Sequence, residues 1–355
     1  MSARPAASVT IPAGSQAAFC GSGSQPNCPL CGQRGSPLLT ELKDLCFGVE
    51  GLWEMRACAG CRIAWLTPRP SRMDFDRNYR DYFTHAQAGP VDAPKRVREK
   101  IKEAALVKEM GSPAADTPWV QRVMAAAALR IPRYRELVRA AALWLARANG
   151  GVLLDVGCGD GSYMKRMRDL GWRVQGIDPD RRAVEVARAR FDLEVEEGRL
   201  EENRFPDNSF DAVVAGHVIE HVHDPLTFLR ECRRILRPGG RLVVLTPNYL
   251  GLQRRWLGRR WIGLDCPRHL FLFSRRSLGR CCEMAGLNVY NLRTTAREGK
   301  NFWRLSRERS GPRWPPVERK SFGLRIEALM YEWIERTALL FWPDAGGEIL
   351  LLAGK

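Results

Sequence analysis

The chain has 355 residues, of which 45% are hydrophobic and 27% are charged, a balance typical of a globular protein with a substantial core. No apolar run reaches the roughly 18 residues that a membrane-spanning helix requires, so we expect no membrane span. The 11 cysteines occur in a long chain without a secretory signal. This pattern favours a reducing cytoplasm over a disulfide-stabilised secreted scaffold.

The net charge is +16, and most of it is concentrated in one stretch. Residues 252–325 contain 18 Arg or Lys against 5 Asp or Glu, an excess of +13. Such a stretch favours an anionic partner, such as nucleic acid, a phosphorylated, nucleotide-linked or lipid-linked small molecule, or an acidic membrane surface. The alternative is a set of solvated helix faces.

Residues 1–27 are rich in Ala, Ser, Gly and Pro and predict a flexible tail. Two CxxC pairs follow within residues 28–68, and short strands are expected from Leu52 to Trp65. Two such pairs supply the four thiolates of a closed tetrahedral zinc site, so we predict a structural zinc ion rather than a catalytic one. The predicted ligands are Cys28, Cys31, Cys58 and Cys61, with Cys46 as a weaker substitute.

Helical patterns dominate residues 69–150, and Gly150-Gly151 ends them. From Val152 onward, apolar strand-like runs alternate with amphipathic helices. This alternation predicts an α/β fold with a doubly wound, mostly parallel sheet that is covered by helices on both faces.

A glycine-rich turn separates the first of these strands from its helix. Glycines at 157, 159 and 161 let a ligand approach the backbone, and the helix N-terminus that follows offers free N–H groups. Asp178 lies 21 residues after Gly157, close to the roughly 20 expected for a carboxylate that binds ribose hydroxyls. The spacing predicts a nucleoside site.

The charge of the turn distinguishes between nucleosides. The spacing does not satisfy the GxGxxG pattern of dinucleotide sites, and Asp155 precedes the turn. This carboxylate would repel a pyrophosphate, whereas it suits the cationic ammonium and sulfonium groups of S-adenosylmethionine (SAM). SAM is therefore the expected cofactor, and an NAD-dependent oxidoreductase is an alternative.

This stretch resembles motif I of the class I SAM-dependent methyltransferases, and further blocks follow in the family's order. They are Gly176-Ile177-Asp178, FPDNSFD from Phe205, HVIEHVHDP from His217 and ILRPGG from Ile235. The resemblance implies a Rossmann-like methyltransferase domain over 151–355, in which residues 251–345 form a substrate lid or insert. The cofactor residues that it implies are Asp155, Gly157, Cys158, Gly159, Gly161, Asp178, Leu200, Gly216 and His217.

The sequence departs from the family pattern at the adenine site. Relatives often carry an acidic residue before the FPDNSFD block, where this chain has Arg199. Glu201 or a backbone carbonyl is the expected substitute.

The segment PRHLFLFS, from Pro267 to Ser274, resembles bacterial methyltransferases that begin with a CxxC...CxxC module and act in saccharide or secondary-metabolite pathways. Histidine is the usual base near neutral pH. The candidate catalytic bases are His217, His221 and His269, and Glu220 is a candidate to orient one of them.

We therefore expect methyl transfer to a small molecule, such as a saccharide, a nucleotide-linked sugar or a secondary metabolite, with O-methylation preferred over C- or N-methylation. A homodimer is a further expectation, because Phe322–Trp342 predicts a broadly apolar helix. The alternative is an RNA methyltransferase or nucleic-acid-binding protein that uses the zinc module and the basic stretch.

Overall fold

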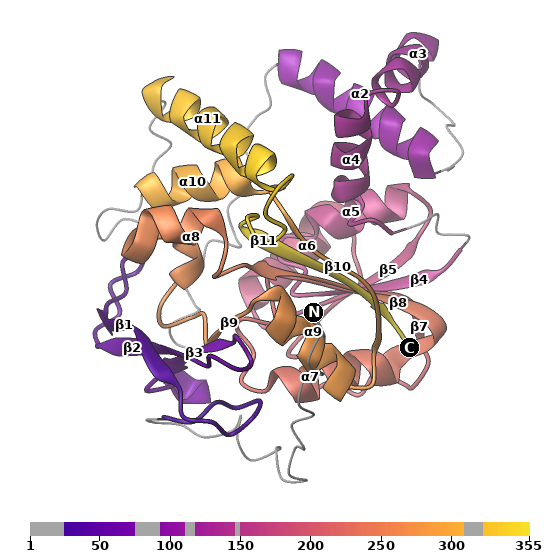
Figure 1. Cartoon of the computed structure of the whole chain (residues 1–355). Helices are drawn as coiled ribbons and strands as arrows, with labels where there is room; N and C mark the ends of the chain where they lie inside the picture. The colour runs from indigo at the N-terminus through magenta and orange to yellow at the C-terminus, as the bar shows by residue number, and fades with distance from the viewer. Residues whose placement is uncertain (1–24, 75–92, 111–117, 146–149, 309–321) are drawn as a thin grey trace, which may run out of the picture.

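A computed structural model describes residues 25–74, 93–110, 118–145, 150–308 and 322–355. Most of the predicted tail, residues 1–27, lies outside the described residues, as do parts of the predicted helical region. Figure 1 shows the central sheet with helices packed on both of its faces.

Seven strands form the central sheet in the order β10-β11-β8-β7-β4-β5-β6. Strands β4 to β8 pair in parallel, whereas β11 is antiparallel to both β8 and β10. The predicted α/β fold with a mostly parallel sheet is confirmed. The strands are β4 (Val152–Val156), β5 (Arg173–Asp178), β6 (Val195–Glu197), β7 (Phe210–Gly216), β8 (Leu236–Pro247), β10 (Asn288–Thr295) and β11 (Glu348–Gly354).

The apolar runs of these strands place alternate side chains on opposite faces of the sheet. Leu153 packs with residues of α2, α4 and α5, whereas its neighbour Leu154 belongs to a core that includes α7 and α9. The covering helices are α2 (Ala93–Met110), α3 (Trp119–Ala128), α4 (Pro132–Ala141), α5 (Ser162–Asp169), α6 (Arg181–Phe191), α7 (Pro225–Ile235) and α9 (Arg275–Met284). The helices that the sequence predicts around the sheet are thus present, and α4 ends at Ala141.

A second, four-stranded sheet has the order β1-β2-β3-β9. Strands β1 (Ser36–Leu42), β2 (Trp53–Ala57) and β3 (Ala64–Thr67) come from the N-terminal module, and β9 (Phe271–Leu272) comes from the far end of the sequence. The short strands predicted between Leu52 and Trp65 are confirmed as β2 and the start of β3.

The two sheets share one continuous core. Met55 and Trp65 of the small sheet are fully buried in the same cluster as Leu154 and Val244 of the large sheet. The stretch 251–345, predicted as a lid or insert, supplies β9, α9 and the edge strand β10. This stretch therefore contributes one strand to each sheet, in addition to the covering helix α9.

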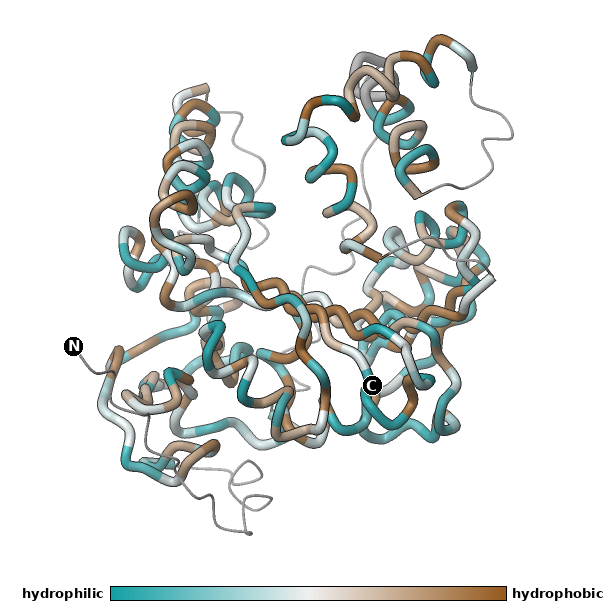
Figure 2. Tube along the Cα trace, turned by 45° about the vertical axis from the view of Figure 1, so that its right-hand side comes forward, coloured by the Kyte–Doolittle hydropathy of each residue, from teal (hydrophilic) through white to brown (hydrophobic). Residues whose placement is uncertain are grey.

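The other elements of this stretch are α8 (Leu252–Leu257), the short 3-10 helices η3 (Gly258–Arg260) and η4 (Ile262–Leu264), α10 (Gly299–Glu308) and α11 (Phe322–Ala338). Helix α11 packs on α10 through a ring stack of Trp303 and Tyr331, with centroids 4.2 Å apart. Trp333 is 66% exposed, so much of the apolar side of α11 is not core. Figure 2 shows hydrophobic residues along α11 as well as in the central strands.

No helix in the described parts of the chain combines the length and the apolar character that crossing a membrane demands.

Candidate functional site

One cavity of about 1200 Å³ lies beyond the carboxyl ends of β4, β5 and β7. Ligand pockets usually measure about 300–1000 Å³, so this cavity is larger than a single ligand usually requires. The carboxyl edge of a parallel sheet is the expected location for a ligand, because the loops after the strands converge there. Its walls come from β5, the loop after β7, helix α7, η4 and α10.

The predicted cofactor residues divide into two groups. Gly157, Asp178, Leu200, Gly216 and His217 line the cavity, whereas Asp155, Cys158, Gly159 and Gly161 are not among its lining residues. The thiol-bearing Cys158 is buried in a small apolar cluster with residues of α5 and α6. A role in holding SAM stays a prediction for both groups.

The glycine turn depends on backbone conformations that side chains disfavour. Gly157, Gly159 and Gly161 all have positive φ values, of 70°, 55° and 75°. A Cβ atom on Gly157 would also lie only 2.5 Å from Cγ2 of Val218. The turn therefore requires glycine for both conformation and space.

Two carboxylates, those of Asp155 and Asp178, lie next to this turn. Asp178 accepts hydrogen bonds from the backbone N–H groups of Gly159 (2.9 Å) and Asp180 (2.8 Å). Burial, together with the negative charge of Asp178, raises the pKa of Asp155 to about 8. A bound cation would relieve this repulsion and favour the ionised form of Asp155. The negative charge of Asp178 on the cavity wall, with Asp155 behind it, is therefore compatible with the positively charged methionine part of SAM.

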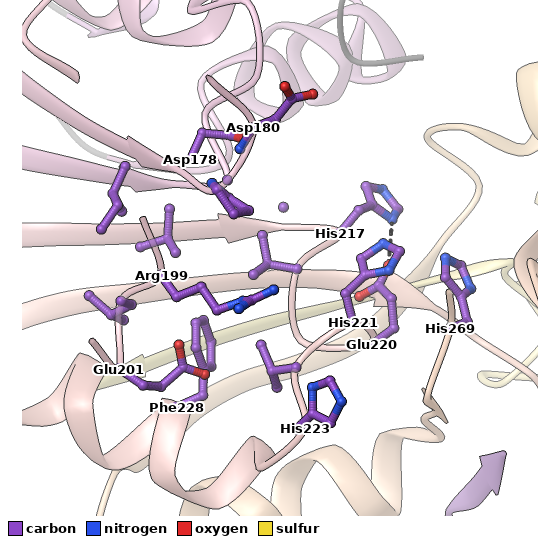
Figure 3. A pocket seen from close by; sticks show the side chains of 18 of the residues that line it. Asp178, Asp180, Arg199, Glu201, His217, Glu220, His221, His223, Phe228 and His269 are labelled. Atoms are coloured by element: carbon purple, nitrogen blue, oxygen red, sulfur yellow. Dashed lines mark hydrogen bonds and ion pairs between the residues drawn. The ribbon is translucent and has the colours of Figure 1, made fainter. Parts of the chain in front are cut away.

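The expected adenine end of the cavity is lined by Arg199, Leu200 and Glu201. Leu200 is 1% exposed, and burial raises the pKa of Glu201. Figure 3 shows Glu201 beside the ring of Phe228, which also lines the cavity. The sequence proposal that Glu201 substitutes for the usual acidic residue is thus compatible with its position.

His217 lies in a network of charged groups. Its Nδ1 is 3.3 Å from Oε1 of Glu220, and its Nε2 is 2.9 Å from Oε1 of Glu348. Burial lowers the pKa of His217, but the hydrogen bonds to Glu220 and Glu348 outweigh it and raise the pKa to about 10. Both ring nitrogens therefore donate protons. A protonated ring with two acceptors has no lone pair, so this geometry argues against His217 as the general base.

His221 and His269 have a different arrangement. Nδ1 of His221 lies 3.0 Å from the carbonyl oxygen of Arg268, and Nδ1 of His269 lies 2.7 Å from that of Gly263. Since a carbonyl only accepts, each Nδ1 carries the proton and each Nε2 keeps its lone pair. The rings meet edge to face with centroids 4.6 Å apart. Figure 3 shows them, with Glu220 alongside, away from Asp178.

Several residues of this site were not predicted from the sequence. Glu348 and Arg297 complete the His217 network, because Nη2 of Arg297 donates to Oε1 of Glu348 at 2.8 Å. Phe302 and Leu305 of α10 line the cavity beside them. Glu348 opens a strand-like run and Phe302 lies in a basic stretch, and neither position carries a local motif.

The four predicted zinc ligands lie together. The sulfur atoms of Cys28, Cys31, Cys58 and Cys61 all lie within 4.8 Å of one another, and those of Cys31 and Cys58 are 3.6 Å apart. Tetrahedral Zn–S bonds of about 2.3 Å separate sulfurs by roughly 3.8 Å, so the cluster fits a zinc ion. Cys46 is buried but is not part of it.

Backbone and charge also suit a metal. The Cys58 amide donates to the carbonyl of Ile63, the Arg62 amide donates to that of Cys58, and the Cys61 amide points at the Cys58 sulfur at 3.3 Å. A hydrogen bond with Cys28 is the main cause that lowers the pKa of Cys61 to about 5. The set has no open position for substrate, which fits a structural ion.

A comparison with known proteins finds similarity to methyltransferases. Residues 126–292 match the family model of a methyltransferase domain. A probable S-adenosylmethionine-dependent methyltransferase from Mycolicibacterium smegmatis is 43% identical over 103 residues, 29% of this chain and 40% of the relative. A ubiquinone biosynthesis O-methyltransferase from Rhodopseudomonas palustris is 33% identical over 159 residues, 39% of this chain and 61% of the relative.

These matches therefore span 40% to 61% of the length of the two curated relatives. Among solved structures, a geranyl diphosphate C-methyltransferase from Streptomyces coelicolor aligns over 81% of this chain and 99% of its own, with 17% identity and a TM-score of 0.47. The matched region contains the glycine turn, Asp178, and the loop with His217 and His221. Residues 126–292 are thus similar to a methyltransferase domain, and the relatives that they match include S-adenosylmethionine-dependent methyltransferases.

Proposed function

We propose that the chain transfers the methyl group of SAM to a small-molecule acceptor, and that a hydroxyl oxygen is the preferred acceptor atom. One observation carries this proposal. A single cavity has Gly157 and Asp178 toward one end and His221 and His269 toward the other (Figure 3). The cofactor would occupy the first end and the acceptor the second.

SAM, when bound, supplies a methyl group that its sulfonium charge has already activated. The chain has to hold an acceptor oxygen in line with that methyl group and exclude water. With SAM bound, the acceptor oxygen would lose its proton to solvent water and form an O–CH₃ bond, while the electron pair of the S–CH₃ bond would stay on sulfur. We propose that His221 and His269 promote the loss of that proton.

The acceptor end of the cavity is partly apolar. Phe302, Leu305 and Ile262 line it together with Asp265 and His269. Such a mixture suits a molecule with a nonpolar body and a few hydroxyls, such as a glycosylated or other secondary metabolite. The named ubiquinone O-methyltransferase relatives support O-methylation. Because those named relatives act in small-molecule biosynthesis, the RNA methyltransferase alternative is not favoured.

The remaining parts of the proposal concern the other regions. We propose that the module at 28–68 holds a structural zinc ion, that 69–150 forms a helical region, and that residues of 251–345 cover the acceptor. The exposed apolar residues of α11 support a homodimer, in which they would be buried. A cytoplasmic location stays a prediction.

Thermal unfolding tests the cofactor assignment. At a concentration of about 100 times its Kd, a ligand adds about 2.7 kcal/mol of stability. We therefore expect SAM to raise the Tm by several degrees and NAD to leave it unchanged. The variant Asp178→Asn should lose at least about tenfold in SAM affinity, because one carboxylate charge at the cofactor end is removed.

The matched control is Asp169→Asn, at the exposed end of α5 and outside the cavity, which should bind SAM as the wild type does. A Tm shift with NAD but none with SAM would exclude the proposal in favour of an oxidoreductase.

A further inference from the structure

A second group of metal-ligating side chains lies at the acceptor end of the cavity. One carboxylate oxygen of Glu220 and one ring nitrogen each of His221 and His269 lie within 4.8 Å of one another. All three residues line the cavity and all three are buried. This group is separate from the four cysteines of the N-terminal module, and within the described residues no other group of this kind is found.

We infer that Glu220, His221 and His269 bind a divalent first-row transition-metal cation, which holds and acidifies the acceptor hydroxyl. The inference rests on the proposed function, and it assigns the two histidines as ligands rather than as direct bases. Two nitrogens and one carboxylate oxygen on one side of a cation leave its other positions open, as expected of a site that also binds substrate.

The orientation of the two rings supports a metal site. A histidine ligand usually donates its second ring N–H to a carbonyl or carboxylate, which fixes the tautomer. Here both Nδ1–H groups donate to backbone carbonyls, those of Arg268 and Gly263. Nε2 is therefore the ring atom of each histidine that would bind a cation, and both rings are held in place by the backbone.

Glu220 is fixed in the same way. Its Oε2 accepts from the hydroxyl of Thr246 at 2.9 Å, and its Oε1 lies 3.3 Å from Nδ1 of His217. Each carboxylate oxygen has two lone pairs, so these bonds leave a lone pair on each for a cation. The Glu220 side chain has no exposed surface, which makes an additional opposite charge favourable.

The spacing is close to that of a bound ion. Two ligands with bonds of about 2.1 Å to one ion are at most about 4.2 Å apart. Separations up to 4.8 Å therefore require only a small inward movement of the side chains. The ring centroids of His221 and His269, 4.6 Å apart, place both imidazoles on the same side of the cavity (Figure 3).

The surrounding charges also favour a cation. Asp44 and Asp265 share the guanidinium of Arg268, so the ion pair beside His269 has one more negative than positive charge. A divalent cation bound nearby would suit an acceptor oxygen that becomes an alkoxide or phenolate. The proton of that hydroxyl passes to solvent water.

The test uses Mn²⁺, which prefers nitrogen and oxygen ligands over thiolates, on the full-length protein with its cysteine module loaded with zinc. Loss of the free Mn²⁺ signal in electron paramagnetic resonance measures binding. We expect one Mn²⁺ per chain, and at least a tenfold weaker affinity in His221→Gln and in His269→Gln. The matched control is His223→Gln, because His223 lines the same cavity outside the group and should bind Mn²⁺ normally.

A SAM-induced Tm shift, measured on every variant, separates the two proposals and shows that each variant is folded. Normal SAM shifts with the expected pattern of Mn²⁺ binding support the metal site. A normal SAM shift without Mn²⁺ binding by the wild type overturns it and leaves the methyltransferase proposal intact. Equal Mn²⁺ affinity in His269→Gln and the wild type also overturns it. Absence of any SAM shift in the wild type overturns the proposed function instead.

Discussion

Asp44 and Arg268, which are 224 residues apart in sequence, form a fully buried bidentate ion pair. The two oxygens of Asp44 accept from Nη1 and Nη2 of Arg268 at 2.8 and 2.9 Å, and neither side chain has exposed surface. Asp265 binds the same guanidinium. The carbonyl of Arg268 accepts from His221, and the next residue is His269. The N-terminal module thus positions the loop that carries the histidines of the cavity.

Asp44→Asn should destabilise the protein by about 3 kcal/mol. This value is the low end of the range for breaking a buried pair, because Asp265 remains beside the buried guanidinium. Urea unfolding measures the loss. The exposed pair of Arg72 and Glu202, 3.0 Å apart, provides the control, and Glu202→Gln should cost less than about 1 kcal/mol. Equal effects of the two substitutions would show that the buried pair has no special structural role.

Zinc should be present in one equivalent per chain, measured by elemental analysis of the purified protein. We expect Cys58→Ser to lose the zinc and to unfold at a lower temperature, because three thiolates hold the ion less well than four and the module shares the main core. Cys46→Ser, which changes a buried cysteine outside the cluster, should retain the zinc. Zinc retention by Cys58→Ser together with zinc loss by Cys46→Ser would show that the ligand assignment is wrong.

Gly157→Ala should weaken SAM binding at least about tenfold and reduce stability by roughly 1–2 kcal/mol, the cost of a left-handed non-glycine residue. Its methyl group would also press on Val218, at 2.5 Å from Cγ2. In Gly239→Ala the same strain arises at φ 77° with no atom within 4 Å and away from the cavity. That control should lose stability and keep its SAM affinity. Calorimetric titration measures both affinities, and unchanged binding by Gly157→Ala would contradict the assignment of the turn.

The His217 network should make stability depend on pH. The pKa of His217 rises from 6.5 to about 10 on folding, so its stabilising effect is complete below pH 6.5 and disappears as the pH rises through about 10. The stability difference between the wild type and His217→Gln should therefore be largest near pH 6 and shrink toward pH 10. Urea unfolding at a series of pH values measures it. A difference that grows with pH would show that His217 is neutral in the folded protein.

Glu348 contributes at the opposite end of the pH scale. Burial raises its pKa, but Arg297 and His217 outweigh burial and lower the pKa to about 2. Its stabilising effect is therefore present above the unfolded value of 4.5 and is lost as the pH falls through about 2. Glu348→Gln should be less stable than the wild type near neutral pH, and this difference in stability should disappear in strong acid. Unfolding followed by circular dichroism measures both proteins. A stability difference that persists at pH 2 would indicate a packing effect instead.

Much of the fold and part of the site follow from local sequence. The alternation of apolar runs and helical patterns predicted strands β4, β5 and β7, and the glycines at 157, 159 and 161 occupy the left-handed conformations that the turn requires. The two CxxC pairs predicted the four-sulfur cluster. In each case the signal lies within a few residues, or in a spacing that the chemistry of one ligand imposes.

Only the tertiary structure decided the roles of the histidines. His217, His221 and His269 are all candidates from the sequence, yet Glu348, 131 residues from His217, makes that ring a double donor. The carbonyls of Gly263 and Arg268 leave His269 and His221 with a lone pair each. Protonation and tautomer depend on which groups packing brings within about 3 Å, and sequence spacing does not encode such contacts between distant segments.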